Sequence, residues 1–294
     1  MVSTAYASYY AFTFIDWLGG FTGMWFVIYF CGNSLIKESY SKSIRASEKE
    51  PSLSTKRYLI KPYIIAWNIY TRVVSSIHAL VVTYYCFYII FNYYGYYYNS
   101  DSGQRSNGLA YVKFLWRFDN YTLEPIAGLY HFRVMSCFSG SYLLVDAIFM
   151  LLEQTEKNML PSVLHHAVGS IGMLGFSLTG LLPYNGIYCM LTEITTIPLN
   201  ITWIFAKLKP EGAPWKALGL FIYIFLGAIT WLLFFVFRVV GAFWIMGSLM
   251  RDFNLILTFH WIPAIICLIA NPIICVLNLM WFLKLTQLIL THDR

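Results

Sequence analysis

Six ionisable side chains stand inside stretches of sequence that are otherwise apolar. They are His78, Asp146, His165, His166, Glu193 and Arg238, and two amides, Asn200 and Asn278, occur in similar surroundings. An ionisable group inside a membrane is costly unless it is paired or faces water, so each of these residues marks a candidate site. An imidazole can act as a general base near neutral pH, and a carboxylate can fix its tautomer. The sequence therefore offers Asp146, His165 and His166 as candidate catalytic residues.

The two adjacent histidines suit acid–base chemistry better than metal binding. His165 and His166 are about 100° apart on a helix, so one ring can face an interior chamber while the other faces a neighbouring helix. No His-x-x-x-His or Glu-x-x-His spacing occurs within one helix, and the six cysteines include no Cys-x-x-Cys pair. We therefore expect no metal site and no cofactor.

The composition places these residues in a membrane. Of the 294 residues, 59% are hydrophobic and only 12% are charged, whereas a soluble domain carries about 25% charged residues. The mean hydropathy is +0.60. An ordinary soluble globule and a disordered chain are both excluded. The fold class we predict is all-α, a polytopic transmembrane helical bundle.

Seven segments are long enough to cross about 30 Å of hydrocarbon. They cover residues 10–31, 71–96, 129–152, 160–180, 186–206, 216–246 and 255–284, with 62–70 as a short helix leading into the second. Thirteen lysines and arginines fall in the loops and tail on one side, and five on the other. The positive-inside rule then places the N-terminus outside and the C-terminus in the cytosol, or in the matrix of a mitochondrion. Residues 1–60 form a first helix and a basic loop, 61–290 the main domain and 291–294 a tail.

Counting residues from the expected span ends puts several polar groups at one depth. Five helices each place one about 10 Å inside the cytosolic face: His78, Asp146, the histidine pair, Asn200 and Asn278. Glu193 lies nearer the midplane, and Arg238 lies further toward the outer side. This pattern predicts a polar chamber that opens toward the cytosolic leaflet. The alternative is that these groups only form hydrogen bonds between helices.

At these residues the chain resembles the TLC family, whose domain is shared by TRAM, LAG1 and CLN8 proteins. The resemblance is to the CLN8-type members rather than to TRAM, and it covers about residues 60–290. The similar stretches are AWNIYTRVVSSIHAL, GSYLLVDAIFMLLE, LPSVLHHAVGSIGML, LTEITTIPLNITW, FFVFRVV and LNLMWFLKL. It implies several spans around a pocket for a lipid or acyl chain. The family's functional positions would fall on His78, Asp146, His165, His166, Glu193, Asn200 and Arg238.

Three functions are consistent with this sequence. The first is a protein that binds, senses or redistributes phospholipids or acyl chains, with His78, Glu193, Asn200, Arg238 and Asn278 in the binding site. The second is an acyltransferase-like enzyme in which His165 or His166 is the general base. The third is a non-catalytic accessory subunit that packs against other membrane subunits.

Two activities are not expected. The resemblance includes the ceramide synthases, whose sequences have further Asp residues after the histidine pair. This chain has no Asp between His166 and Asn200, so acylation of a sphingoid base is disfavoured. Nucleic acid is not an expected partner, because no basic stripe of helical period is present. The expected location is the endoplasmic reticulum membrane, with the mitochondrial inner membrane as the alternative.

Overall fold

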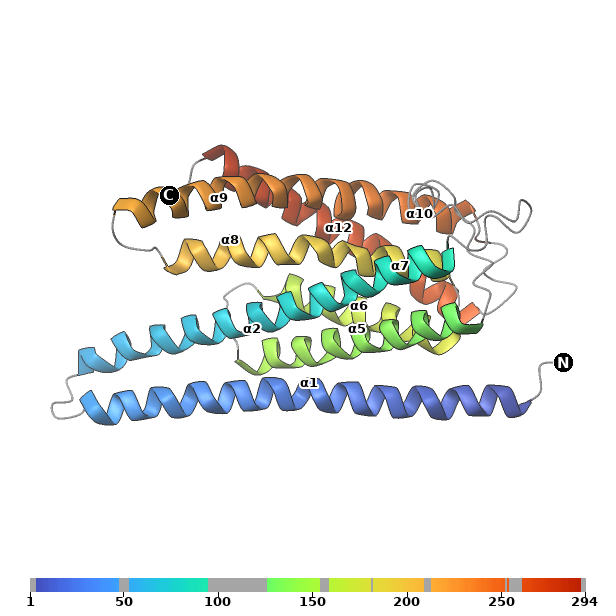
Figure 1. Cartoon of the computed structure of the whole chain (residues 1–294), viewed down its shortest axis with the longest axis horizontal. Coiled ribbons are helices and arrows are strands. Elements are labelled where there is room, and N and C mark those ends of the chain that lie inside the picture. Colours follow the sequence, from blue (N-terminus) through green and yellow to red (C-terminus); the bar gives the residue numbers. More distant parts are fainter. Residues whose placement is uncertain are drawn as a thin grey trace.

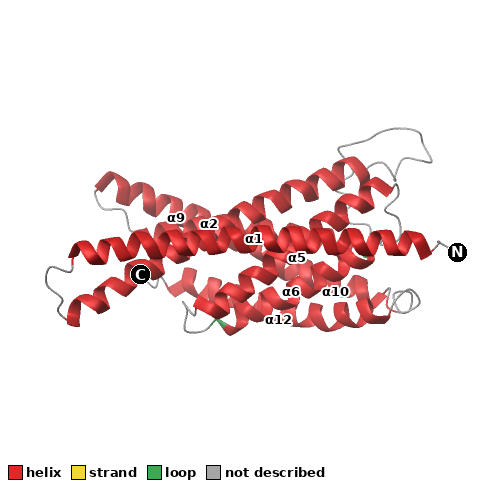
Figure 2. Ribbon diagram, turned by 90° about the horizontal axis from the view of Figure 1, so that it is seen from below, coloured by secondary structure: helices red, strands yellow, loops and turns green. Residues whose placement is uncertain are grey.

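The chain folds into a bundle of long helices, shown as a ribbon in Figure 2. The computed structural model describes residues 4–47, 53–94, 126–153, 159–180, 182–208, 213–251, 253 and 261–291. Within these ranges every regular element is a helix and no strand is present. The all-α prediction is confirmed for this part of the chain.

Twelve helical elements follow one another along the described ranges. They are α1 (Thr4–Ser47), α2 (Leu53–Ile89), η1 (Ile90–Tyr94), α5 (Ile126–Glu153), α6 (Leu160–Thr179), α7 (Pro183–Leu191), η2 (Thr192–Thr195), α8 (Thr196–Leu208), α9 (Ala213–Leu233), η3 (Phe234–Val240), α10 (Gly241–Arg251) and α12 (Trp261–Thr291). The main helices run alongside one another, with α1 at one edge of the bundle and α9 at the opposite edge (Figure 1).

Five helical segments among the described residues are long and apolar enough to cross a membrane. They are Thr13–Lys42, Tyr63–Asn92, Leu129–Glu153, Gly219–Arg251 and Leu268–Leu290. They overlap the first, second, third, sixth and seventh predicted spans. The fourth and fifth predicted spans, 160–180 and 186–206, are helical as well, but are not among these five.

Helices α5 and α6 form a hairpin, and hydrogen bonds from side chains of one helix to carbonyls of the other fix how the two helices are aligned. Arg133 donates from Nε to the Ser177 carbonyl (2.7 Å) and from Nη2 to the Leu178 carbonyl (2.8 Å), which lie in the last turn of α6. Carbonyls in this position have no partner within their own helix. Further along the hairpin, Ser170 Oγ donates to the Gly140 carbonyl at 2.8 Å. Continued in the same register, the hairpin brings the level of Asp146 opposite the histidine pair.

The close approach of α1 to α2 depends on a glycine. A Cβ added to Gly32 would lie 2.1–2.4 Å from three atoms of Tyr70, so no other residue fits unless the ring moves. The same ring donates its hydroxyl to the Ile28 carbonyl at 2.7 Å. The close packing at Gly32 and this hydrogen bond hold α1 against α2.

Candidate functional site

A cavity of about 420 Å³ lies inside the bundle, within the size range of ligand pockets. Its lining comes from α1, α2, α5, α6, η2, α8, η3 and α12. Six of the eight residues singled out from the sequence line it: Asp146, His165, His166, Glu193, Asn200 and Arg238. The structure therefore brings together polar groups that are as much as 92 positions apart in the sequence.

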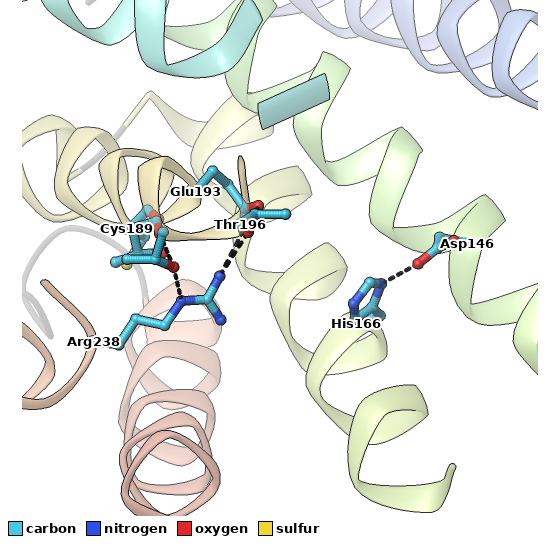
Figure 3. A network of polar contacts seen from close by, with 8 residues as sticks. Asp146, His166, Cys189, Glu193, Thr196 and Arg238 are labelled. Carbon is cyan, nitrogen blue, oxygen red and sulfur yellow. Dashed lines mark hydrogen bonds and ion pairs between the residues drawn. The ribbon is translucent and has the colours of Figure 1, made fainter. Parts of the chain in front are cut away.

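Asp146 and His166 face each other across the α5–α6 hairpin (Figure 3). His166 Nδ1 lies 2.8 Å from Asp146 Oδ2, and their side chains are 19% and 7% exposed. The two atoms are not aligned for a linear hydrogen bond, so the contact is mainly electrostatic. The other carboxylate oxygen, Oδ1, accepts a hydrogen bond from the hydroxyl of Tyr29 on α1. Both oxygens of this buried carboxylate thus have a partner.

His165 points to a different neighbour. Its ring packs edge-on against Trp281 of α12, with ring centroids 4.9 Å apart. Its Nδ1 is buried and has no hydrogen-bond partner among the described residues. One histidine thus faces α5 and the other α12, as their spacing on a helix predicts. Within the described part of the chain, no three His, Cys, Asp or Glu side chains come together so that they could hold a metal ion.

A buried arginine lies at a departure from α-helical geometry. Arg238 belongs to the π-helical segment η3, and Glu193 to the 3₁₀ segment η2. Arg238 donates from Nε to Thr195 Oγ1 (2.7 Å) and from Nη2 to Thr196 Oγ1 (3.1 Å), and its Nη2 lies 3.7 Å from Glu193 Oε1 (Figure 3). Thr196 in turn donates to Glu193 Oε2 at 2.9 Å. π-helical turns are frequent at functional sites.

Asn200 is held by a second arginine, which the sequence analysis missed. Arg72 Nη1 donates to Asn200 Oδ1, and Asn200 Nδ2 donates to the Arg72 carbonyl, both at 3.1 Å. The Arg72 guanidinium also lies 4.0 Å above the Trp203 ring. Arg72 was not singled out, because a predicted span that begins at residue 71 places it at the membrane surface. In the structure α2 begins at Leu53 and Arg72 lies within it.

Two predicted site residues, His78 and Asn278, lie outside the cavity lining. His78 is fully buried and stacks on Tyr142, with ring centroids 3.9 Å apart and planes at 18°. Tyr142 lines the cavity, so its ring closes the cavity in front of His78. Asn278 is also buried and lies about one helical turn from Trp281, which does line the cavity. His78 is therefore not part of the cavity lining. Counting residues gives the depth of a side chain but not which ring stands between it and a cavity.

The cavity combines polar and apolar side chains. Several of its polar residues are buried: Tyr29, Asp146, Asn200 and Arg238 are at most 7% exposed. Apolar lining residues include Met159 at the start of α6 and Leu285 and Leu288 near the end of α12. Leu288 is 55% exposed. We call the part of the cavity near Met159, Leu285 and Leu288 its mouth, and the part near Glu193 and Arg238 its floor.

A family model of the TLC domain matches residues 68–287. The chain belongs to the TLC-domain family. The family predicted from the sequence is thereby confirmed, and the matched stretch contains all eight predicted site residues. It begins after α1, so Tyr29 lies outside it. Comparison with curated proteins and with solved structures found no match. As a member of this family with several apolar helices, the chain is a membrane protein.

Proposed function

We propose that this TLC-domain protein binds a lipid or acyl chain in the cavity, with the polar group of the ligand at the floor and the hydrocarbon at the mouth. The observation that carries the proposal is the distribution of side chains along the cavity wall. Charged and amide side chains share the cavity wall with tryptophan, methionine and leucine side chains. An amphipathic ligand that enters with its polar group first matches both ends.

The floor offers hydrogen-bonding capacity to a ligand. His165 Nδ1 has no partner among the described residues, although its atom is buried. A buried polar atom without a partner costs free energy, which a bound polar group would recover. Arg238 and Glu193 add charges held in fixed positions at the same floor. A carbonyl, hydroxyl or phosphate group of a lipid therefore has partners here.

The topology that we propose has seven spans, with α6 and the α7–η2–α8 segment crossing the membrane as the fourth and fifth. These two segments carry much of the site: His165 and His166 lie on α6, and Glu193 and Asn200 lie in η2 and α8. Helices that direct polar side chains into a bundle interior need not be apolar all round. The N-terminus would be outside, and the cavity mouth would face the cytosol or the matrix, in the endoplasmic reticulum or the mitochondrial inner membrane.

The contact between Asp146 and His166 favours acyl transfer as a second candidate function. A carboxylate next to Nδ1 favours the tautomer that carries its proton there. The Nε2 atom is then free to accept a proton from an attacking hydroxyl or amine, as a general base does. Of the two histidines, His166 is the better candidate, because His165 contacts a tryptophan and no carboxylate.

Photochemical labelling tests the lipid-binding proposal. Cells expressing the protein would be fed a fatty acid that carries a diazirine and an alkyne, and the adducts would be mapped by peptide mass spectrometry. We expect adducts on the lining residues Met150, Met159 and Leu285. Adducts confined to Leu220 and Phe221, which are exposed on the outside of α9, would contradict the proposal. The chain would then be better explained as an accessory subunit.

A further inference from the structure

The first helix contributes to the site although it lies outside the region that the family model matches. That region begins at residue 68, whereas α1 ends at Ser47. Even so, Tyr29 of α1 lines the cavity and donates its hydroxyl hydrogen to Asp146 Oδ1. The Asp146 carboxylate thus contacts the Tyr29 hydroxyl of α1 as well as the His166 ring of α6.

Tyr29 is firmly positioned, both by its own ring and by the helix that carries it. Its ring is fully buried and stacks on Phe149, which lies one helical turn beyond Asp146 on α5, with centroids 5.0 Å apart and planes at 29°. The neighbouring Ile28 carbonyl accepts a hydrogen bond from Tyr70 on α2. Four residues further along α1, Asn33 donates to Glu153 at the end of α5. Helix α1 is thus anchored on both sides of Tyr29.

We propose that Tyr29 is a positioning residue for the histidine pair. Its hydroxyl occupies Oδ1 of Asp146 and fixes the rotation of the carboxylate, so that Oδ2 is directed at His166 Nδ1. The negative charge of the carboxylate then favours the tautomer that carries the His166 proton on Nδ1, and Nε2 is left as the acceptor. Helix α1 is in this way a part of the site rather than a separate membrane anchor. The proposal deepens the proposed function and rests on it for its biological meaning, but the state of His166 is measurable without any ligand.

The Tyr29→Phe variant tests this directly, because it keeps the stacked ring and removes only the hydroxyl. The protein would be labelled with ¹⁵N in its histidine rings, reconstituted in lipid bilayers and compared with wild type by solid-state NMR, with the His166 signals assigned from a His166→Asn sample. We expect the ratio of the Nδ1–H to the Nε2–H tautomer of His166 to fall by roughly tenfold, the effect of losing one hydrogen bond to a charged group. An unchanged ratio would overturn the proposal.

Tyr70→Phe is the matched control. It also removes a tyrosine hydroxyl that ties α1 to its neighbour, but that hydroxyl bonds to a backbone carbonyl and not to Asp146. We expect it to leave the His166 tautomer ratio unchanged. Equal effects of the two variants would show that docking of α1, and not the Tyr29 hydroxyl, controls His166, and the proposal would fail.

A measurement on the wild-type protein covers the case in which Tyr29→Phe does not fold. Solid-state NMR on a sample labelled with ¹³C in tyrosine and aspartate should show a through-space contact between Tyr29 Cζ and Asp146 Cγ. Absence of this contact would overturn the proposal. Neither experiment depends on bound lipid, so failure of the proposed function would leave these results interpretable.

Discussion

The pairing of Arg238 with Glu193 can be measured as a coupling free energy. Arg238 is 7% exposed. It holds two threonine hydroxyls at 2.7 and 3.1 Å and lies 3.7 Å from the Glu193 carboxylate. Breaking a buried ion pair costs about 3–5 kcal/mol, because one charge is left uncompensated. The separation of 3.7 Å exceeds the 2.7–2.9 Å typical of charge-assisted hydrogen bonds. We therefore expect Arg238→Gln to lower the free energy of unfolding by about 3 kcal/mol, the low end of this range.

Glu193→Gln should lower the free energy of unfolding by less, about 1–2 kcal/mol. Arg238 keeps its hydrogen bonds to both threonine hydroxyls, and only its 3.7 Å contact with the Glu193 carboxylate is lost. The double variant removes both charges together and should lower the free energy of unfolding by about 3 kcal/mol, which is less than the sum of the two single effects. The expected coupling is therefore about 1–2 kcal/mol. Reversible unfolding in mixed micelles with increasing SDS, followed by tryptophan fluorescence, gives the free energies of unfolding.

The control for this cycle combines Arg238→Gln with Lys37→Gln. Lys37 is 57% exposed and pairs with Glu153, a different carboxylate, so these two effects should add within about 0.5 kcal/mol. If Arg238→Gln and Glu193→Gln also proved additive, the two charges would not be interacting and the description of the cavity floor would be wrong.

Three further predictions concern the histidines, the helix contact and the orientation. His166→Asn should change the bound lipid or, if the protein turns over a substrate, lower the rate by roughly 10²–10⁴-fold; His165→Asn should have the smaller effect, and equal effects would exclude the special role of His166. In an unfolding assay, Gly32→Ala should destabilise by about 1–3 kcal/mol because a ring occupies the space of its Cβ, whereas Gly23→Ala, with nothing within 4 Å of its Cβ, should be neutral or stabilising. A cysteine at Ser47 should react with an impermeant thiol reagent only from the cytosolic or matrix side, and labelling from the other side would reverse the proposed orientation.

The helical membrane fold follows from properties that are local in the sequence. Apolar runs of spanning length must satisfy their backbone hydrogen bonds within the segment, so they form helices wherever they pack. The two predicted spans that are not among the five long apolar segments are those that carry His165, His166, Glu193 and Asn200. For these two segments, ionisable residues inside an apolar stretch indicate the position of the site better than mean hydropathy indicates a span.

The composition of the site could be predicted only in part. The search for ionisable and amide side chains inside apolar stretches found eight residues, of which six line the cavity. The sequence does not show how far α2 extends beyond its apolar part, and Arg72 was missed for that reason. Nor does it show that the Tyr142 ring stacks on His78 and separates it from the cavity. Nothing in an aromatic-rich chain distinguishes Tyr29, because its role depends on a contact across 117 positions of sequence.

Occupancy of the cavity by a lipid is tested most directly by native mass spectrometry of the purified protein. The account predicts one bound lipid or acyl chain per polypeptide in the wild-type protein. Ser162→Trp, which places a large ring in the cavity lining, should lose it. Leu164→Trp, at a position on the same helix that is 41% exposed, should retain it. A wild-type protein without bound lipid, or a Ser162→Trp variant that retains the same lipid, would contradict the account.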